Sequence, residues 1–189
     1  MTDSDKDGMT QLLKDWRGGN PAAREKISPI VYDALKRIAI GQMRKEREGH
    51  TLQATVLVND VYMELLNEDV DWVDSAHFRA LSATIMRRTL IDHARGKGRV
   101  KRGGDQIAVT LLESRVIDDK DGIDVLTLDD LMNKLASFDE RQAKVIELTF
   151  FGGLTYAEIA EVLGISKATV DRELRIGKAW LLKKLQEGG

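Results

Sequence analysis

The chain has 189 residues and no cysteine, and its 29 lysines and arginines nearly balance 31 aspartates and glutamates, for a formal net charge of −2. Disulfides, a thiol nucleophile and a cysteine zinc site are therefore excluded, and no apolar run approaches the roughly 20 residues of a membrane span. The acidic, polar start "MTDSDKDGMT" is unlike a secretory signal. We expect a cytoplasmic protein that does not act at a membrane.

The first half of the chain predicts four helices. The composition has only two prolines and is rich in residues that favour helices over strands. Apolar residues recur at helical spacing in residues 9–17, from 21 to about 47, in 51–67 and from 74 or 75 to about 96. Residues 1–8 lack this pattern, and we expect them to be frayed.

The second half of the chain predicts a linker and a second helical module. Residues 99–125 show no sustained period, although "QIAVTLLE" could form a short strand. Helical patterns resume near residue 126, continue through "SFDERQAKVIELTFFGG" and are followed by two more helices. We therefore predict an all-α fold with two helical domains, residues 9–98 and 126–187, joined by the linker 99–125.

Charges are segregated along the chain, which the small net charge hides. Residues 86–103 are strongly basic, residues 113–140 are mainly acidic, and the chain is basic again after Ser166. Two basic blocks separated by an acidic one are typical of two anion-binding modules on a linker. A solvated charged surface gives the same pattern, so the charges alone leave both interpretations open.

The stretch "LTYAEIAEVLGISKATVDRELRIGKAWLLKKL" predicts a helix-turn-helix. Thr155 and Glu158 have the spacing of a capping box at the start of the first helix. Gly164 stands where the turn needs a residue that tolerates positive φ, and Ser166 is the expected cap of the second helix. Because each of these positions has a steric reason, the pattern favours this motif over an ordinary helical hairpin.

The second helix of this motif carries the candidate DNA-reading residues. A recognition helix contacts base edges in the major groove with its N-terminal and outward side chains. Those side chains are Lys167, Thr169, Arg172 and Arg175, of which Arg172 could bind a guanine bidentately. Lys178, like Lys183 and Lys184 beyond it, is expected to contact phosphates, which position a protein without specifying sequence.

The order of these features resembles the extracytoplasmic-function (ECF) sigma factors of bacterial RNA polymerase. The resemblance covers nearly the whole chain and rests on "LVNDVYMELL", on "FRALSATIMRRTLIDHARGKGRVKRG" and on the helix-turn-helix stretch. It implies that residues 9–98 are sigma domain two, which docks on core polymerase and melts the minus-ten element. It implies equally that residues 126–187 are sigma domain four, which reads the minus-thirty-five element of promoter DNA.

The resemblance also implies roles for single residues. The basic block is expected to engage DNA phosphates near the melting site, through Arg87, Arg88, Arg95, Lys97, Arg99, Lys101 and Arg102. Trp72, in "NEDVDWVDSAHF", is a candidate platform for stacking a flipped base, unless it is a residue at the edge of the core. Asp171 and Glu173 replace the basic residues usual in the family, which is expected to weaken attraction to phosphates.

The helix that docks on core polymerase in this family carries few acids here. The positions of the family's usual acidic run hold Gln53, Ala54, Thr55 and Val56. We expect Asn59, Asp60 and Glu64 to form the docking face. A face with two acids should bind a basic partner more slowly and more weakly than one with several.

Phosphorylation of Thr51 or Thr55 would supply the missing charge, since a phosphate adds about −1.5 to −2 at neutral pH. Thr51 stands at the expected helix N-terminus, where the helix dipole favours an anion, and a basic segment, Arg44 to Arg47, lies just upstream. An ordinary N-cap explains Thr51 equally well. Three modes of control stay open: a Ser/Thr kinase, an anti-sigma protein, or the chain itself packing its two domains over their DNA-facing surfaces.

Other classes of function fit the sequence less well. His50, His77 and His93 match no metal-binding spacing and no phosphate-binding glycine motif occurs, so we expect no enzyme, no metal and no cofactor. The alternative function is a helix-turn-helix activator that binds DNA without core polymerase. Residues 1–98, however, lack the strand pattern of a receiver or ligand-binding sheet domain. A helical adaptor would explain the bundle but not the two basic blocks.

Overall fold

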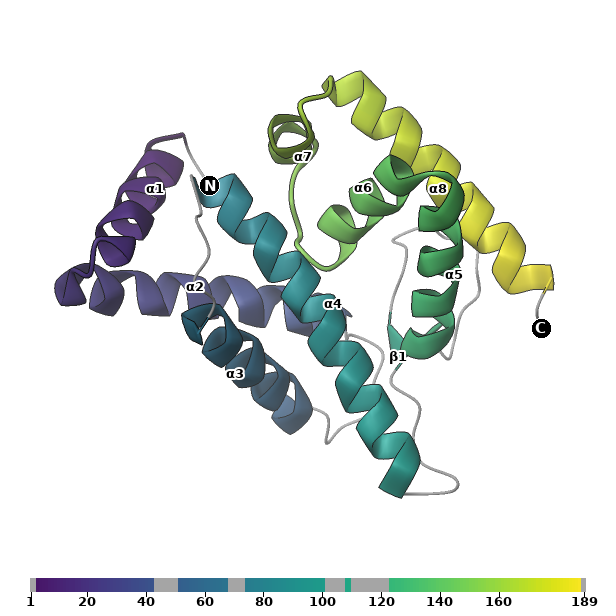
Figure 1. Cartoon of the computed structure of the whole chain (residues 1–189), viewed down its shortest axis with the longest axis horizontal. Helices are drawn as coiled ribbons and strands as arrows, with labels where there is room; N and C mark the ends of the chain where they lie inside the picture. The colour runs from purple at the N-terminus through teal and green to yellow at the C-terminus, as the bar shows by residue number, and fades with distance from the viewer. Residues whose placement is uncertain (1–2, 43–50, 68–73, 101–107, 110–122, 188–189) are drawn as a thin grey trace.

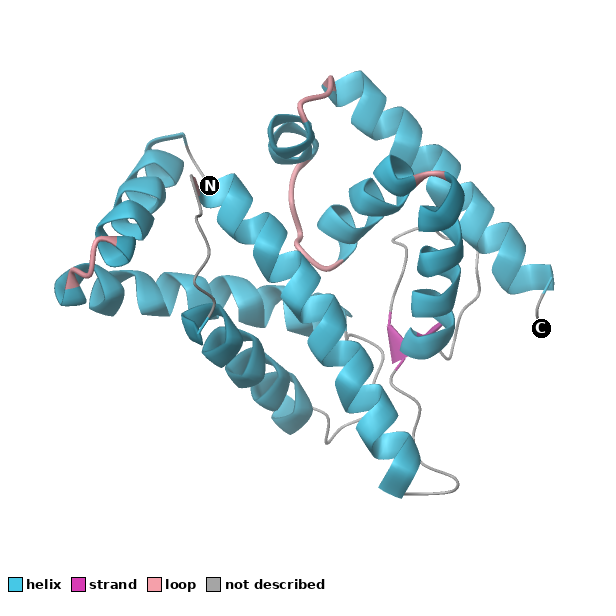
Figure 2. Cartoon of the chain, in the orientation of Figure 1, coloured by secondary structure: helices cyan, strands magenta, loops and turns pink. Residues whose placement is uncertain are grey.

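Two helical bundles make up the computed structural model, which describes residues 3–42, 51–67, 74–100, 108–109 and 123–187 (Figures 1 and 2). The first bundle contains α1 (Asp3–Arg17), α2 (Pro21–Gln42), α3 (Thr51–Asn67) and α4 (Ser75–Val100). The second contains α5 (Val125–Phe138), α6 (Glu140–Phe150), α7 (Tyr156–Leu163) and α8 (Lys167–Glu187). The predicted all-α fold is confirmed.

Several predicted helix boundaries need correction. Helix α1 begins at Asp3 instead of residue 9, and acidic residues near a helix start suit the positive end of the helix dipole. Helix α4 continues past Gly96 and Gly98 to Val100, because each glycine weakens a helix by only about 1 kcal/mol and does not by itself end it. The expected extension of α2 to about residue 47 lies outside the described residues.

A short pair of strands precedes the second bundle. Strand β1 (Ala108–Val109) pairs antiparallel with β2 (Ile123–Asp124), with Ala108 opposite Asp124 (Figure 2, magenta). The stretch "QIAVTLLE" therefore does contain a strand, whose partner the sequence pattern did not identify. Asp124 then caps α5, since its Oδ2 accepts a hydrogen bond from the Thr127 backbone N–H at 3.1 Å.

The first bundle is held by apolar stripes of the kind that helical periodicity predicts. Leu13, Ile27, Leu35 and Leu65, from three helices, are fully buried. These stripes bring α2 against α1 and α3, and α3 against α4. Helix α4 therefore packs one face against α3 and turns another face to the second bundle (Figure 1).

The second bundle is closely packed between α6 and α8. Gly177 of α8 faces α6, and a Cβ placed there would lie 2.6 Å from Ile146 Cδ1 and 2.9 Å from Gln142 Cγ. Only a residue without a side chain allows the two helices to approach this closely. The approach fixes α8, the second helix of the motif predicted above, on the rest of its bundle.

The two bundles meet along α4, which packs against α5, α6 and α7. Figure 1 shows α4 running between the two groups of helices. Their buried apolar residues form one continuous cluster. The bundles are therefore docked against each other in this conformation.

Candidate nucleic-acid interface

Helices α7 and α8 form the predicted helix-turn-helix. Thr155 Oγ1 accepts from the Glu158 backbone N–H at 3.4 Å, and Glu158 Oε2 accepts from the Thr155 N–H at 2.8 Å, which completes the capping box. Gly164 ends α7 with φ 63° and ψ 34°, the left-handed conformation that favours glycine. The Ile165 N–H donates to the Ala160 carbonyl at 3.0 Å and closes the turn. These predictions are confirmed.

Helix α8 begins as expected and buries the expected side. Ser166 Oγ accepts from the Thr169 backbone N–H at 3.1 Å, so Ser166 caps the helix. Val170 and Leu174 are buried against the bundle. The opposite side of the helix is consequently directed to solvent.

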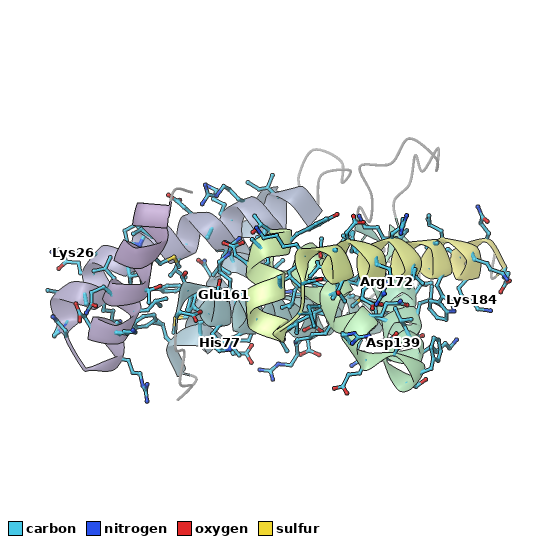
Figure 3. All side chains as sticks on the ribbon, turned by 90° about the horizontal axis from the view of Figure 1, so that it is seen from above. Lys26, His77, Asp139, Glu161, Arg172 and Lys184 are labelled. Carbon is cyan, nitrogen blue, oxygen red and sulfur yellow. The ribbon has the colours of Figure 1, made fainter. Side chains whose placement is uncertain are left out.

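The candidate base-reading residues lie along that outward side. Lys167, Arg172 and Arg175 are exposed, and Figure 3 shows Arg172 and Lys184 on this helix, with Glu161 on α7. Thr169 is half-buried and its hydroxyl lies 2.9 Å from Ser166 Oγ. Lys178 is half-buried one turn further along the helix. The arrangement places several cations on one solvent-facing side of the helix.

Glu173 does not belong to that side, which corrects the sequence interpretation. It is 4% exposed and accepts hydrogen bonds from Gln142 Nε2, Arg141 Nη2 and Arg172 Nη2 at 3.1–3.2 Å. Burial opposes ionisation, but the hydrogen bonds from Arg172 and Gln142 and the nearby arginine charges lower the pKa of Glu173 below its ordinary value. Only Asp171 is an exposed acid at this point of the helix. Glu173 holds α8 to α6 instead of repelling phosphates.

The predicted docking residues of α3 are tied to neighbouring helices. Asn59 Oδ1 accepts from the Tyr32 hydroxyl of α2 at 3.0 Å. Asp60 Oδ2 lies 2.8 Å from His93 Nε2 of α4. Glu64 forms an ion pair with Arg88, also of α4. Both acids of the predicted docking face therefore already have a basic or imidazole partner within the chain.

The basic helix α4 gives its predicted DNA-binding residues different surroundings. Arg88 pairs with Glu64 and is largely exposed, and Arg95 is exposed. Arg87 is only 15% exposed and is bound to the second bundle. The side chains of Lys97, Arg99, Lys101 and Arg102 lie outside the described residues, as do Trp72 and the side chain of Thr51.

Arg87 is surrounded by acceptors from α5 and α6. Its Nε and Nη2 donate to Asp129 Oδ1 at 3.0 and 2.6 Å, Nη2 also donates to Asn133 Oδ1 at 2.8 Å, and Nη1 donates to Glu147 Oε2 at 3.0 Å. Lys144 Nζ and the Thr84 hydroxyl complete the environment of Glu147. Burial opposes ionisation of Glu147, but hydrogen bonds from Lys144, Thr84 and Arg87 lower its pKa below the ordinary value.

A second cationic contact joins the bundles two turns earlier on α4. Arg79 Nη1 donates to Glu158 Oε1 at 2.6 Å, and its Nη2 donates to the Gly153 carbonyl at 2.8 Å. Glu158 thus takes part in both the capping box and this contact.

Sequence reasoning did not identify Arg79, Asp129 or Glu147. The only available signal was the eight-residue spacing of Arg79 and Arg87, which puts both on one side of a helix.

A cavity of about 510 Å³ lies beside this contact, between the two bundles. Its walls are mainly apolar and come from both sides, with Val31 and Phe78 on one and Phe150 on the other. This space is partly open to solvent, so it is a groove at the surface of the junction and not an enclosed void.

The described residues contain no group of three or more histidines, aspartates and glutamates that could hold a metal ion. Within the same ranges, no helix is long and apolar enough to cross a membrane.

Comparison with known families agrees with the resemblance seen in the motifs. The profile described as ECF sigma factor matches residues 6–187, nearly the whole chain. A search of curated proteins gives no match. The chain therefore belongs to the ECF sigma factor family, whose members act in transcription initiation with core RNA polymerase, promoter DNA and anti-sigma factors.

Proposed function

We propose that this ECF sigma factor binds core RNA polymerase in the cytoplasm and directs it to a set of promoters. The first bundle would melt the minus-ten element and the second would read the minus-thirty-five element. The observation that carries the proposal is the left-handed turn at Gly164 before α8. Lys167, Arg172 and Arg175 lie on the solvent side of that helix. The protein acts by binding and not by catalysis.

In vitro transcription with core polymerase on a library of genomic promoters tests this function. Adding the protein should create start-site selectivity that core enzyme lacks. Promoter binding measured with and without core polymerase distinguishes a sigma factor from the alternative, an activator, because an ordinary activator binds its DNA site without polymerase. Tight, sequence-specific binding without polymerase, combined with no effect on core enzyme, would favour the activator.

The recognition helix can be tested residue by residue. Arg172→Ala should relax sequence preference at one promoter position, at a cost of about 1–3 kcal/mol there. Lys178→Ala should weaken binding about equally on all promoters. It should also lower the slope of log affinity against log salt concentration by about one. Lys26→Ala, at an exposed lysine of α2, is the matched control for loss of one positive charge away from the proposed DNA-binding residues. Equal effects of Arg172→Ala on every promoter would contradict base reading.

Activation by threonine phosphorylation is the second part of the proposal. Helix α3 begins at Thr51 and has no acid in its first turn, and Thr55 is exposed one turn later. The acids that follow, Asp60 and Glu64, are paired with α4. Added charge at the start of α3 would then be the main negative charge available to a basic surface of the polymerase.

Binding of core polymerase by Thr51→Glu, Thr55→Glu and kinase-treated protein tests this part. The acidic variants should bind faster and more tightly than wild type, with a larger gain at low salt because surface charges are screened by ions. Thr51→Gln and Thr55→Gln are the controls, since they change size without adding charge. Equal affinity of modified and unmodified protein would end the phosphorylation hypothesis and leave the sigma function intact.

A further inference from the structure

The groove between the two bundles has the size and the walls of a ligand site. Its volume is about 510 Å³, which is within the range of pockets that hold small molecules. Its lining is mainly apolar and comes from both bundles, with Ile30 of α2, Phe78 of α4 and Phe150 of α6 among the contributors. Ile30 is 42% exposed, so a ligand that covered it would remove apolar surface from water. We call the space lined by these residues the junction groove.

Helix α2 supplies one wall of the junction groove as a stripe of apolar residues. Ile30, Ala34 and Ile38 are spaced by four residues, so they lie on one side of the helix, and all three line the groove. At Ile38 this wall meets the second bundle, because a Cβ added to Gly153 would lie 3.4 Å from Ile38 Cγ1. The stripe therefore runs along the groove to the turn that follows α6.

The charged residues of the lining leave one cation available. Arg79 Nη1 lies 2.6 Å from Glu158 Oε1 and Arg79 Nη2 donates to the Gly153 carbonyl at 2.8 Å, so the charges of Arg79 and Glu158 offset each other. Arg37 also lines the groove and is exposed, and within the described residues its guanidinium forms no ion pair or hydrogen bond. Arg37 stands three residues after Ala34 and so shares its side of α2. The junction groove therefore combines apolar walls with one unpaired positive charge.

We propose that the junction groove binds a small molecule with an apolar body and one carboxylate, of the class of a medium-chain fatty acid. The carboxylate accepts two parallel hydrogen bonds from the Arg37 guanidinium, and the apolar body lies against the α2 stripe and Phe78. A phosphate ester fits less well, because it carries nearly two negative charges and the groove offers one unpaired cation beside the carboxylate of Glu158. This binding goes beyond the proposed promoter function and does not depend on it.

Calorimetric titration of the full chain with decanoate, below the concentration at which it forms micelles, tests the site. Decanoate should bind saturably, with one molecule per chain. Arg37→Gln should weaken decanoate binding about tenfold, because hydrogen bonds between charged groups are among the stronger ones. The same variant should change the binding of 1-decanol, which has the same chain and no charge, by less than about twofold. Arg24→Gln, at an exposed arginine of α2 that does not line the groove, is the matched control and should bind decanoate as wild type does.

Nuclear Overhauser effects locate the bound molecule. The methylene protons of decanoate should show these effects to the ring protons of Phe78 and Phe150, which line the groove. Ile30→Asp is the second variant, since its exposed position tolerates a polar side chain and the added charge should weaken decanoate more than 1-decanol. If circular dichroism shows that Arg37→Gln is unfolded, Ile30→Asp decides.

Three results would overturn the proposal: no saturable binding of decanoate to wild type, equal losses for decanoate and 1-decanol in the folded variants, or Overhauser effects only to aromatic residues outside the groove. Failure of promoter-directed transcription would refute the proposed function and would leave the result of these titrations unchanged.

Discussion

Replacing Gly152 by alanine tests how the bundles fit together. A Cβ at this position would lie 2.4 Å from Leu154 Cδ1, 2.7 Å from the Leu148 carbonyl oxygen and 2.9 Å from Ala83 Cβ. The leucine side chain can turn, but the carbonyl is backbone and Ala83 is a buried residue of the other bundle. Overpacking of this kind costs about 1–3 kcal/mol, and the less flexible unfolded chain of an alanine variant offsets about 0.4–1 kcal/mol. We expect a net loss of about 1 kcal/mol.

Urea unfolding followed by circular dichroism measures this loss. Gly96→Ala is the matched control, because Gly96 lies within α4 and has nothing within 4 Å of the added Cβ. That substitution should raise the free energy of unfolding by about 0.5–1 kcal/mol through helix propensity. If Gly152→Ala unfolds at the same urea concentration as wild type while Gly96→Ala behaves as expected, Gly152 does not lie in close contact with Ala83.

Three further changes address the second bundle and its junction. Thr155→Ala removes one hydroxyl from the capping box of α7 and should cost about 1 kcal/mol in urea unfolding; no loss would contradict the cap. Leu135→Ala, at a fully buried position, should cost about 2–5 kcal/mol, against less than about 0.5 kcal/mol for the exposed Lys134→Ala. Because its pKa in the folded protein lies below 4.5, Glu147 stabilises the fold above about pH 4.5, and this contribution is lost as the pH falls through the lowered pKa. Glu147→Gln should therefore show a shallower loss of stability on acidification than wild type.

The helix-turn-helix could be predicted almost residue by residue because its rules are local. A capping box needs only Thr155 and Glu158 three residues apart, and the left-handed turn needs only Gly164. Both features are present with the expected geometry. The same locality explains the error at the start of α1, where no apolar period marks the first turns although the residues are compatible with a helix.

The direction of a charged side chain was harder to predict. The family resemblance implies that Glu173 belongs to the DNA-facing side, yet it is buried. Its spacing could have shown this, since it stands three residues after Val170 and four before Gly177, both of which face α6 or the core. A helical position three or four residues from buried ones shares their face whatever its charge. The partners Gln142 and Arg141 could not be found, because they depend on how α6 and α8 pack.

The pairing of Arg87 with acids of the same chain gives the segregated charges a second interpretation. A basic block before an acidic one suggests two anion-binding modules, but the same order is produced by a chain whose acids bind its own arginines. Sequence cannot separate these cases, because a carboxylate and a phosphate offer an arginine the same paired acceptors. The structure favours binding of the arginines by the chain's own acids. Ala83 lies between Arg79 and Arg87 on one side of α4 and packs against Gly152, and this contact involves no nucleic acid. Part of the charge pattern of this sequence is therefore internal pairing, in which Asp129 and Glu147 bind Arg87 of the same chain.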